Sequence, residues 1–262
     1  MLVAVDIGNT KIAVGFLDGG TVVGKYRITT DGGGSSDEYA LKLRRFLAMT
    51  GARRQDVEGV VVSSVVPKVM HAFRGGVVKL FGIEPLVVGP GVRTGINIAL
   101  ANPRAVGADR VADATAAWHL YGGPTLVIDF GTATTYDYID GRGSFRAGAI
   151  NVGFQTAADA LTGATAQLPD VELADPGTVL GTDTRAAIQA GLFYGFVGGV
   201  EHTIRRFADE TGSMPRVVAT GGLGRLVHRE TDLIDVADPD LIMKGLAIIH
   251  ALNRPSPAAR RS

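Results

Sequence analysis

The chain has 262 residues, of which 46% are hydrophobic and only 6% aromatic, so we expect two α/β halves with mainly aliphatic cores. Its 26 basic residues balance its 26 acidic residues, which disfavours nucleic-acid binding. The absence of cysteine excludes disulfides, thiolate metal sites and cysteine nucleophiles. The N-terminal residues carry no basic leader and no long apolar run, so we expect a cytoplasmic protein with no membrane partner.

The first half opens on an apolar strand that ends in the motif Asp6-Ile7-Gly8-Asn9-Thr10. An Asp-Gly turn at Asp18 then separates two further strands, which is typical of a hairpin. A capping box that begins at Ser35 predicts the first helix. In chain order we predict strands over residues 2–5, 12–17 and 22–28, a helix over 35–51, a strand over 60–66, a helix from 67, a strand over 85–88 and a helix over 111–121.

The second half repeats this order. An apolar strand over residues 126–128 ends in Asp129-Phe130-Gly131-Thr132-Ala133-Thr134, and an Asp-Gly turn follows at Asp140. The repeat predicts a duplicated α/β unit with a cleft between the halves, the alternative being two hairpins that are alike by chance. The remaining predicted elements are a strand that ends near 139, a strand over 144–150, a helix from 154, a helix over 184–210, a strand over 216–219 and a helix over 240–252.

Each Asp-x-Gly loop has the residues that phosphate binding needs. Gly8 and Gly131 allow backbone amides to approach an anion, and Asp6 and Asp129 are candidate Mg²⁺ ligands. A single copy would more simply be a capped turn, whereas two copies favour phosphate binding. Neighbouring residues complete the predicted ATP-binding set: Asn9, Thr10, Lys11, Thr132, Ala133 and Thr134. This double hairpin resembles that of the actin, hexokinase and Hsp70 superfamily.

A segment at Gly19–Lys25 matches part of a P-loop, Gly-x4-Gly-Lys. The next residue is Tyr26, where a P-loop needs Ser or Thr for magnesium. The segment is also predicted to be a hairpin rather than a strand-loop-helix. We therefore do not interpret it as a P-loop.

A second candidate cluster lies before the helix predicted over residues 111–121. It begins at Asn102-Pro103 and continues with Gly107-Ala108-Asp109-Arg110. An Asp near a helix start stays ionised, and an Asp beside an Arg suits a kinase that accepts a hydroxyl proton while holding an anionic substrate. The alternative is a simple helix-terminal acid with a solvated Arg. We expect Asp109 on the acceptor side, away from both Asp-x-Gly loops.

These motifs, together with Ser64-Val65-Val66-Pro67 and Thr220-Gly221-Gly222, resemble those of the type III pantothenate kinases, in the same order along nearly the whole chain. The resemblance implies ATP-dependent phosphorylation of pantothenate by duplicated actin-like, ribonuclease H-like domains. Asp109 would be the catalytic base. Gly107, Ala108, Arg110 and Thr184 would bind pantothenate, and Gly221 and Gly222 would lie by adenosine.

The resemblance also implies Mg²⁺ with ATP, a monovalent cation (K⁺ or NH₄⁺) and a homodimer. The apolar stretch Ala186–Phe196 favours a dimer interface on the second-half helices. We predict an N-terminal domain over 1–115, a C-terminal domain over 116–252 and a flexible tail over 253–262.

One segment departs from the family pattern Gly-Gly-x-Ile-x-Pro-Gly. Here the chain reads Ala147-Gly148-Ala149-Ile150-Asn151-Val152-Gly153. The loss of proline is expected to free this loop and to add a backbone donor on the substrate side. Two alternatives therefore stay open: a paralogue that phosphorylates another small hydroxy acid, and a non-catalytic nucleotide-binding regulatory homologue.

Overall fold

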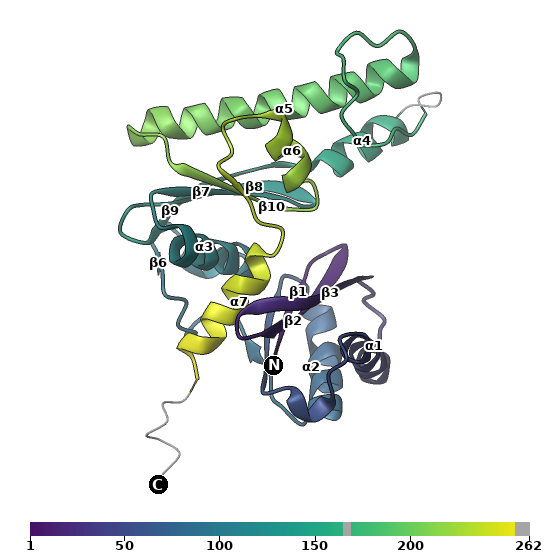
Figure 1. The fold of residues 1–262 in the computed structure, drawn as a ribbon, viewed down its shortest axis with the longest axis vertical. Helices are drawn as coiled ribbons and strands as arrows, with labels where there is room; N and C mark the ends of the chain where they lie inside the picture. Colours follow the sequence, from purple (N-terminus) through teal and green to yellow (C-terminus); the bar gives the residue numbers. More distant parts are fainter. Residues whose placement is uncertain (165–168, 255–262) are drawn as a thin grey trace. The chain divides into compact units, whose positions relative to one another are not determined.

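The computed structural model describes residues 1–164 and 169–254 and divides the chain into two compact units (Figure 1). The first unit comprises Met1–Leu120 and the segment from Asp240 onward, and the second comprises Tyr121–Pro239. Most of the predicted tail, residues 255–262, lies outside the described residues. No helix in the described ranges combines the length and apolar character needed to span a membrane.

The first unit is built on a mixed five-stranded sheet with the order β3-β2-β1-β4-β5. Strand β1 pairs antiparallel with β2 and parallel with β4. The strands are β1 (Leu2–Ile7), β2 (Lys11–Asp18), β3 (Thr21–Thr29), β4 (Gly59–Ser64) and β5 (Leu86–Val87). The remaining elements are α1 (Ser36–Met49), η1 (Arg54–Asp56), α2 (Pro67–Phe81), β6 (Asn97–Ile98), η2 (Pro103–Ala105), α3 (Ala108–Tyr121) and α7 (Leu241–Leu252).

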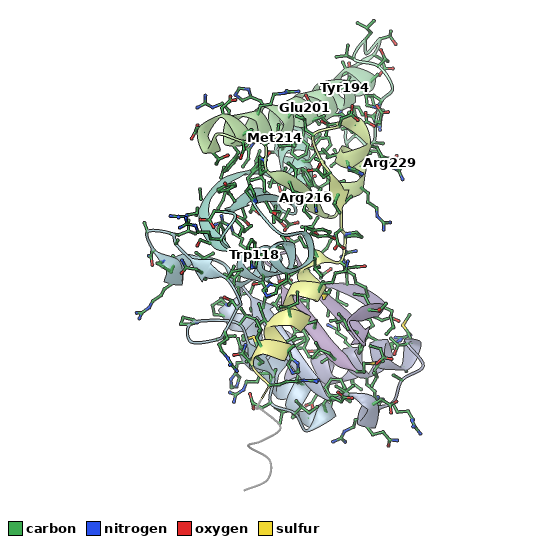
Figure 2. The ribbon with its side chains drawn as sticks, turned by 60° about the vertical axis from the view of Figure 1, so that its left-hand side comes forward. Trp118, Tyr194, Glu201, Met214, Arg216 and Arg229 are labelled. Carbon is green, nitrogen blue, oxygen red and sulfur yellow. The ribbon has the colours of Figure 1, made fainter. Side chains whose placement is uncertain are left out.

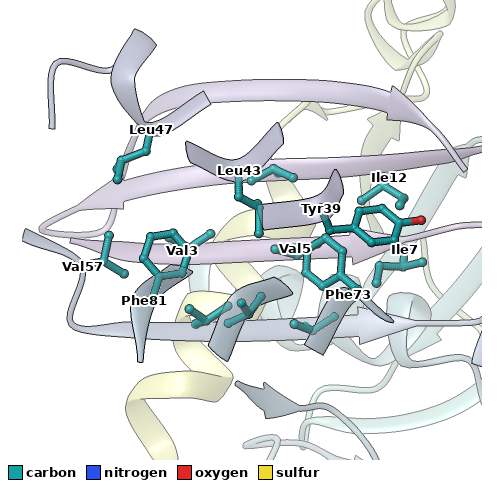
Figure 3. Packing of buried hydrophobic residues seen from close by; sticks show 14 of the residues in the cluster. Val3, Val5, Ile7, Ile12, Tyr39, Leu43, Leu47, Val57, Phe73 and Phe81 are labelled. Atoms are coloured by element: carbon teal, nitrogen blue, oxygen red, sulfur yellow. The ribbon is translucent and has the colours of Figure 1, made fainter. Parts of the chain in front are cut away.

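Alternation along β1 gives this sheet two apolar faces. Val3, Val5 and Ile7 point to one face, where they pack with Tyr39 of α1 and Phe73 of α2 (Figure 3). The opposite face packs against α3 and α7 through a second buried cluster: Ala4, Leu17, Val61, Val88, Ala112, Met243, Leu246 and Ile249. The intervening position at the end of β1 on this second face is Asp6. A carboxylate is thereby placed where the apolar contacts end.

Helix α7 belongs to the first unit, whereas the expected domain boundaries grouped it with the second half. Its apolar side chains complete the core on the α3 side of the first sheet. Glycines permit the close packing: a Cβ at Gly15 would lie 2.7 Å from the sulfur of Met243, and one at Gly245 would collide with the Ala112 carbonyl. The chain thus leaves the first unit after α3 and returns to it with α7.

The second unit repeats the topology of the first. Strands β9-β8-β7-β10-β11 are neighbours in that order, with β7 antiparallel to β8 and parallel to β10. This correspondence confirms the predicted duplicated α/β fold. The strands are β7 (Thr125–Phe130), β8 (Ala133–Ile139), β9 (Ser144–Val152), β10 (Arg216–Gly221) and β11 (Val236–Ala237), and the helices are α4 (Phe154–Gly163), α5 (Thr184–Thr211) and α6 (Gly224–Glu230).

The long helix α5 covers one face of the second sheet, and Figure 2 labels Tyr194 and Glu201 on it. Phe193, Val197 and Ile204 of α5 are buried in one cluster with sheet residues such as Ile128 and Val217. The apolar stretch predicted to be a dimer interface therefore contributes in part to the core of its own unit.

Candidate active site

The first Asp-x-Gly loop connects β1 to β2 as a closed hairpin. The Gly8 amide donates to the Lys11 carbonyl at 3.0 Å, and the Thr30 hydroxyl donates to the Gly8 carbonyl at 2.7 Å. Asn9, Thr10 and Lys11 at the tip are exposed. The backbone of the loop is thus held from within the first unit while its polar tip faces solvent, as a phosphate-binding loop requires.

The carboxylate of Asp6 is held by the neighbouring parallel strand. Asp6 pairs with Ser63 of β4, and the Ser63 hydroxyl donates to Asp6 Oδ1 at 2.7 Å. Burial raises the pKa of Asp6 to about 6, opposed by the Ser63 hydrogen bond; the charge of Asp109 raises this pKa further and that of Lys25 lowers it. A cation beside Asp6 would favour its ionised form.

Asp109 lies in the first turn of α3, which begins earlier than predicted, at Ala108. Its Oδ1 accepts a hydrogen bond from the Arg110 amide at 2.8 Å, and a Cβ at Gly107 would collide with the same oxygen. Glycine at 107 is therefore what allows the carboxylate to fold back over the helix start. The expectation that Asp109 lies away from both loops was wrong for the first loop, because its neighbour Gly107 packs beside Val65, whose amide donates to the Ile7 carbonyl at the end of β1.

Three predicted motifs meet at this end of the first sheet. The Val65 amide donates to the Ile7 carbonyl at 3.1 Å, which joins the segment after β4 to the end of β1. A Cβ at Gly107 would lie 3.7 Å from the Val65 side chain. The first loop, the Ser-Val-Val-Pro segment and the Gly-Ala-Asp-Arg segment are thus neighbours within one unit.

The second Asp-x-Gly loop connects β7 to β8 and packs against the start of α4. The Gly131 amide donates to the Ala133 carbonyl at 3.1 Å, while the Thr132 carbonyl accepts from the Gly153 amide at 3.1 Å and from the Thr156 hydroxyl at 2.8 Å. Thr132 and Gly131 are exposed, whereas Thr134 is buried. A ligand from solvent can therefore reach the tip of the loop, whereas Thr134 is covered.

Glycines enclose the carboxylate of Asp129. Thr220 of β10 pairs with Asp129, and the next residue, Gly221, has a φ of +84°. A Cβ at Gly221 would collide with Asp129 Oδ1 and with the Phe130 carbonyl. The Gly222 amide also donates to the Phe130 carbonyl, at 3.1 Å. The Thr-Gly-Gly motif therefore shapes the space around Asp129 in addition to its expected place by adenosine.

The segment that departs from the family pattern is not a freed loop, as we had expected, but the end of strand β9. Val152 pairs with Ala133, and the Val152 amide donates a hydrogen bond to the Asn151 side-chain oxygen at 2.8 Å. Gly153 is retained where a side chain would collide with the carbonyls of Gly131 and Thr132. The backbone donor gained by the loss of proline is thus satisfied locally.

Thr184 is the first residue of α5, and it is exposed. The Asp183 side chain caps the helix by accepting from the Ala186 amide at 2.9 Å. A side chain at Gly181 would collide with the backbone of this first helical turn. The cap and the glycine together fix the N-terminus of α5 with Thr184 presented to solvent.

The residues present suit Mg²⁺ bound together with a phosphorylated ligand. No group of three or more His, Cys, Asp or Glu side chains that could hold a metal occurs among residues 1–164 and 169–254. Magnesium typically uses one or two protein carboxylates and takes its other ligands from phosphates and water. Asp6 and Asp129 each offer a carboxylate in surroundings shaped by a phosphate-type loop, which fits this mode.

Two partners of the site were missed by sequence reasoning. Ser63 holds Asp6, which could be found only by aligning β4 with β1 in register. Lys25, dismissed with its P-loop-like segment, forms an ion pair of 2.9 Å with Asp240 and acts on Asp6 by its charge.

Comparison with known proteins places these features in a family. The family model of type III pantothenate kinases matches residues 2–206. A "Type III pantothenate kinase" of Bifidobacterium longum subsp. infantis is 54% identical, covering 97% of this chain and 99% of the relative. One from Agathobacter rectalis is 45% identical, covering 95% and 96% respectively.

Solved structures agree at the level of the fold. The activator of the 2-hydroxyisocaproyl-CoA dehydratase from Clostridium difficile, with bound ADPNP, has a TM-score of 0.60 and 14% identity and covers 100% of this chain and 97% of its own. At this low identity the likeness concerns the fold alone. The sequence relationship is more specific: the chain belongs to the type III pantothenate kinase family.

Proposed function

We propose that this enzyme uses ATP to phosphorylate the terminal hydroxyl of pantothenate, giving 4'-phosphopantothenate in the first step of coenzyme A biosynthesis. The main observation in support of this proposal is the nearly full-length match, at 54% identity, to a protein named type III pantothenate kinase. The Asp6 carboxylate, which Ser63 holds and which Asp109 influences by its charge, also supports the proposal. A non-catalytic homologue has no need to keep both Asp6 and Asp109. We also propose that the enzyme acts in the cytoplasm.

Asp109 is the proposed base that accepts the proton of the pantothenate hydroxyl. Its carboxylate is fixed over Gly107 at the start of α3, where its Oδ1 accepts a hydrogen bond from the Arg110 amide. A positioned base contributes roughly 10²–10⁴-fold. Most of the acceleration of a kinase must therefore come from orientation and from stabilisation of phosphate charge.

Pantothenate is anionic, and Arg110 is its proposed carboxylate partner. A guanidinium suits this role because its planar fork can donate two parallel hydrogen bonds to a carboxylate. Gly107 and Ala108 would contact the substrate through the backbone at the start of α3. Thr184 would add a hydroxyl, and its exposed place at the start of α5 supports this role.

ATP is the proposed ligand of both Asp-x-Gly loops. The exposed loop tips supply amide and hydroxyl donors for phosphate oxygens, and the buried Thr134 would support the second loop from within. Asp6 and Asp129 would hold magnesium, which when bound offsets phosphate charge. The proposed contacts are Gly8, Asn9, Thr10, Lys11, Gly131, Thr132, Ala133, Gly221 and Gly222.

A monovalent cation, K⁺ or NH₄⁺, is proposed as a further requirement. Neither loop carries a lysine placed as in a P-loop, so additional positive charge beside the phosphates would have to come from ions. Turnover should fall strongly when potassium and ammonium are replaced by Tris. Undiminished turnover in Tris alone would remove this requirement.

A homodimer through α5 is proposed, and the outer face of this helix supports it. Gly191, Gly195, Gly198 and Gly199 are exposed and lie on one side of the helix, and a Cβ added at any of them would meet no atom within 4 Å beyond the helix's own backbone. Glycines allow close approach of a second helix. Replacement of Gly195 by Trp should convert a dimer to a monomer in light scattering, and an unchanged mass would place the interface elsewhere.

The proposed substrate is tested by coupled ADP release with pantothenate and a panel of related hydroxy acids. Pantothenate should show the highest kcat/KM. Preference for another hydroxy acid would favour the paralogue that the altered segment at 147–153 suggested. Nucleotide binding without any turnover would favour a regulatory homologue.

A further inference from the structure

The pair Lys25–Asp240 connects two parts of the first unit that are far apart in sequence. Lys25 lies on β3, and Asp240 is the residue that precedes α7. The Lys25 ammonium lies 2.9 Å from Asp240 Oδ1, with side-chain exposures of 16% and 33%. Such partial burial distinguishes this pair from the exposed ion pairs of the unit, such as Lys79–Asp37, with exposures of 55% and 77%.

The sheet register explains why the two side chains meet. Lys25 pairs with Gly15, so both residues face the same side of the sheet. That side is covered by α7, because a Cβ at Gly15 would lie 2.7 Å from the Met243 sulfur. Lys25 therefore points toward the start of α7, where its ammonium group forms the ion pair with Asp240.

A second contact joins α7 to α3. Gly245 lies so close to α3 that a Cβ there would collide with the Ala112 carbonyl, and Ala112 is completely buried. Ala112 lies one helical turn beyond Asp109 on the same helix. Helix α7 is therefore fixed to β3 at its start, and its middle contacts the first turns of α3 where Gly245 meets Ala112.

We propose that the Lys25–Asp240 ion pair is a positioning contact, which fixes α7 on the first sheet and thereby places Asp109 relative to Asp6. This inference rests on the proposed function of Asp109. Lys25 and Asp240 act here through α7 and α3 and not on the substrate. Loss of the pair loosens the start of α3 and misplaces the base, while the Asp-x-Gly loop stays closed by its own backbone hydrogen bonds.

The test compares Lys25→Met, Asp240→Asn and Lys25→Arg with the wild type, and uses Lys79→Met as the matched control at an exposed pair. Lys25→Met and Asp240→Asn should each lower kcat about 10-fold and raise the KM for pantothenate. Mg·ATP affinity should stay within about twofold in Asp240→Asn, the variant that keeps the Lys25 charge near Asp6. Lys25→Arg should keep most of the activity, and Lys79→Met all of it. Unchanged kcat in either variant, or a parallel loss of Mg·ATP affinity in Asp240→Asn, would overturn the proposal.

A single neutralisation leaves a partly buried charge without its ion-pair partner and can therefore hinder folding. The double variant Lys25→Met/Asp240→Asn avoids this problem and should show the same kcat defect; normal kcat in the double variant would contradict the positioning role.

Hydrogen exchange supplies a readout that does not depend on activity. The amides of Arg110 and Val111, which donate to Asp109 Oδ1 and to the Gly107 carbonyl, should exchange about 10-fold faster in the double variant, and unchanged exchange would overturn the proposal. If the wild type fails to phosphorylate pantothenate, the proposed function fails while this exchange measurement still decides the positioning contact.

Discussion

The two Asp-x-Gly loops lie at equivalent places in two sheets of the same order, yet their surroundings differ. In the first unit the hairpin closes with Ile7 opposite Ile12, and in the second with Phe130 opposite Thr134, so the second loop is one residue shorter. The residue that pairs with the loop carboxylate is Ser63 in the first unit and Thr220 in the second.

The larger difference lies one residue further along. Ser64 follows Ser63 in β4, whereas Gly221 follows Thr220 in β10 and closes over Asp129. The first carboxylate, Asp6, instead has a second acid, Asp109, and a cation, Lys25, close enough to influence its charge. The duplicated fold has thus kept the loop in both units, whereas the described surroundings of the loop carboxylate differ: a serine, an acid and a lysine act on Asp6, and a glycine of positive φ closes over Asp129.

The largest expected effect concerns Asp109. Asp109→Asn keeps the size and hydrogen-bonding reach but removes the proton acceptor, so kcat should fall by about 10²-fold or more. The affinity for Mg·ATP, measured by calorimetry with a non-hydrolysable analogue, should change less than about twofold. Near-normal kcat combined with a collapse of nucleotide binding would mean that Asp109 serves nucleotide binding and not proton transfer.

The next effect is on stability and concerns Asp6 in metal-free, nucleotide-free protein. The pKa of Asp6 is raised from 3.8 to about 6 by burial, so the folded state holds a proton that the unfolded state has already released. The stability contribution of protonated Asp6 is present below pH 3.8 and is lost as the pH rises to about 6. The unfolding free energy falls by about 2 kcal/mol over this range, a value that allows for the partial exposure of Asp6.

Asp6→Asn does not titrate and should avoid this loss. The unfolding free energy of the variant relative to wild type should therefore increase by about 2 kcal/mol between about pH 4 and pH 7, as measured by urea denaturation. A difference that does not change with pH would mean that burial does not disfavour the Asp6 carboxylate. The same variant should lower turnover and weaken Mg·ATP binding.

A smaller effect is expected at Gly221. Gly221→Ala introduces a Cβ at a φ of +84° and against Asp129, so the affinity for Mg·ATP should fall about 10-fold. Gly212→Ala is the matched control, because Gly212 has a φ of +79° but no neighbouring atom within 4 Å of its Cβ position. It should lower stability without weakening Mg·ATP binding. Equal losses of affinity in both variants would attribute the effect to backbone strain alone.

Much of the fold could be predicted because its signals are local. Alternating apolar strands, the Asp-Gly turns at Asp18 and Asp140 and the capping box at Ser35 each act over a few residues, and the structure contains the corresponding strands and helix. The membership of α7 could not be predicted in this way. Its sequence indicates a buried helix, but an apolar helix does not state which sheet it will cover.

The candidate site likewise has features that could be predicted from local sequence and features that could not. The loops and the segment Gly107–Arg110 are contiguous in sequence and could be recognised as motifs. The partners of Asp6 could not, because Ser63 reaches it through the register of two parallel strands. Lys25 and Asp240 are separated by 215 positions, and their meeting depends on the return of the chain to the first unit.

The central claim is that this enzyme transfers phosphate to pantothenate instead of releasing it to water, as an ATPase of the same fold would do. The most direct measurement is ³¹P NMR and mass spectrometry of the products formed from ATP, Mg²⁺ and pantothenate in potassium buffer. We predict one 4'-phosphopantothenate for each ADP, with little free phosphate and with product formation lost in Asp109→Asn. ADP accompanied by an equal amount of free phosphate, with pantothenate unchanged, would contradict the claim.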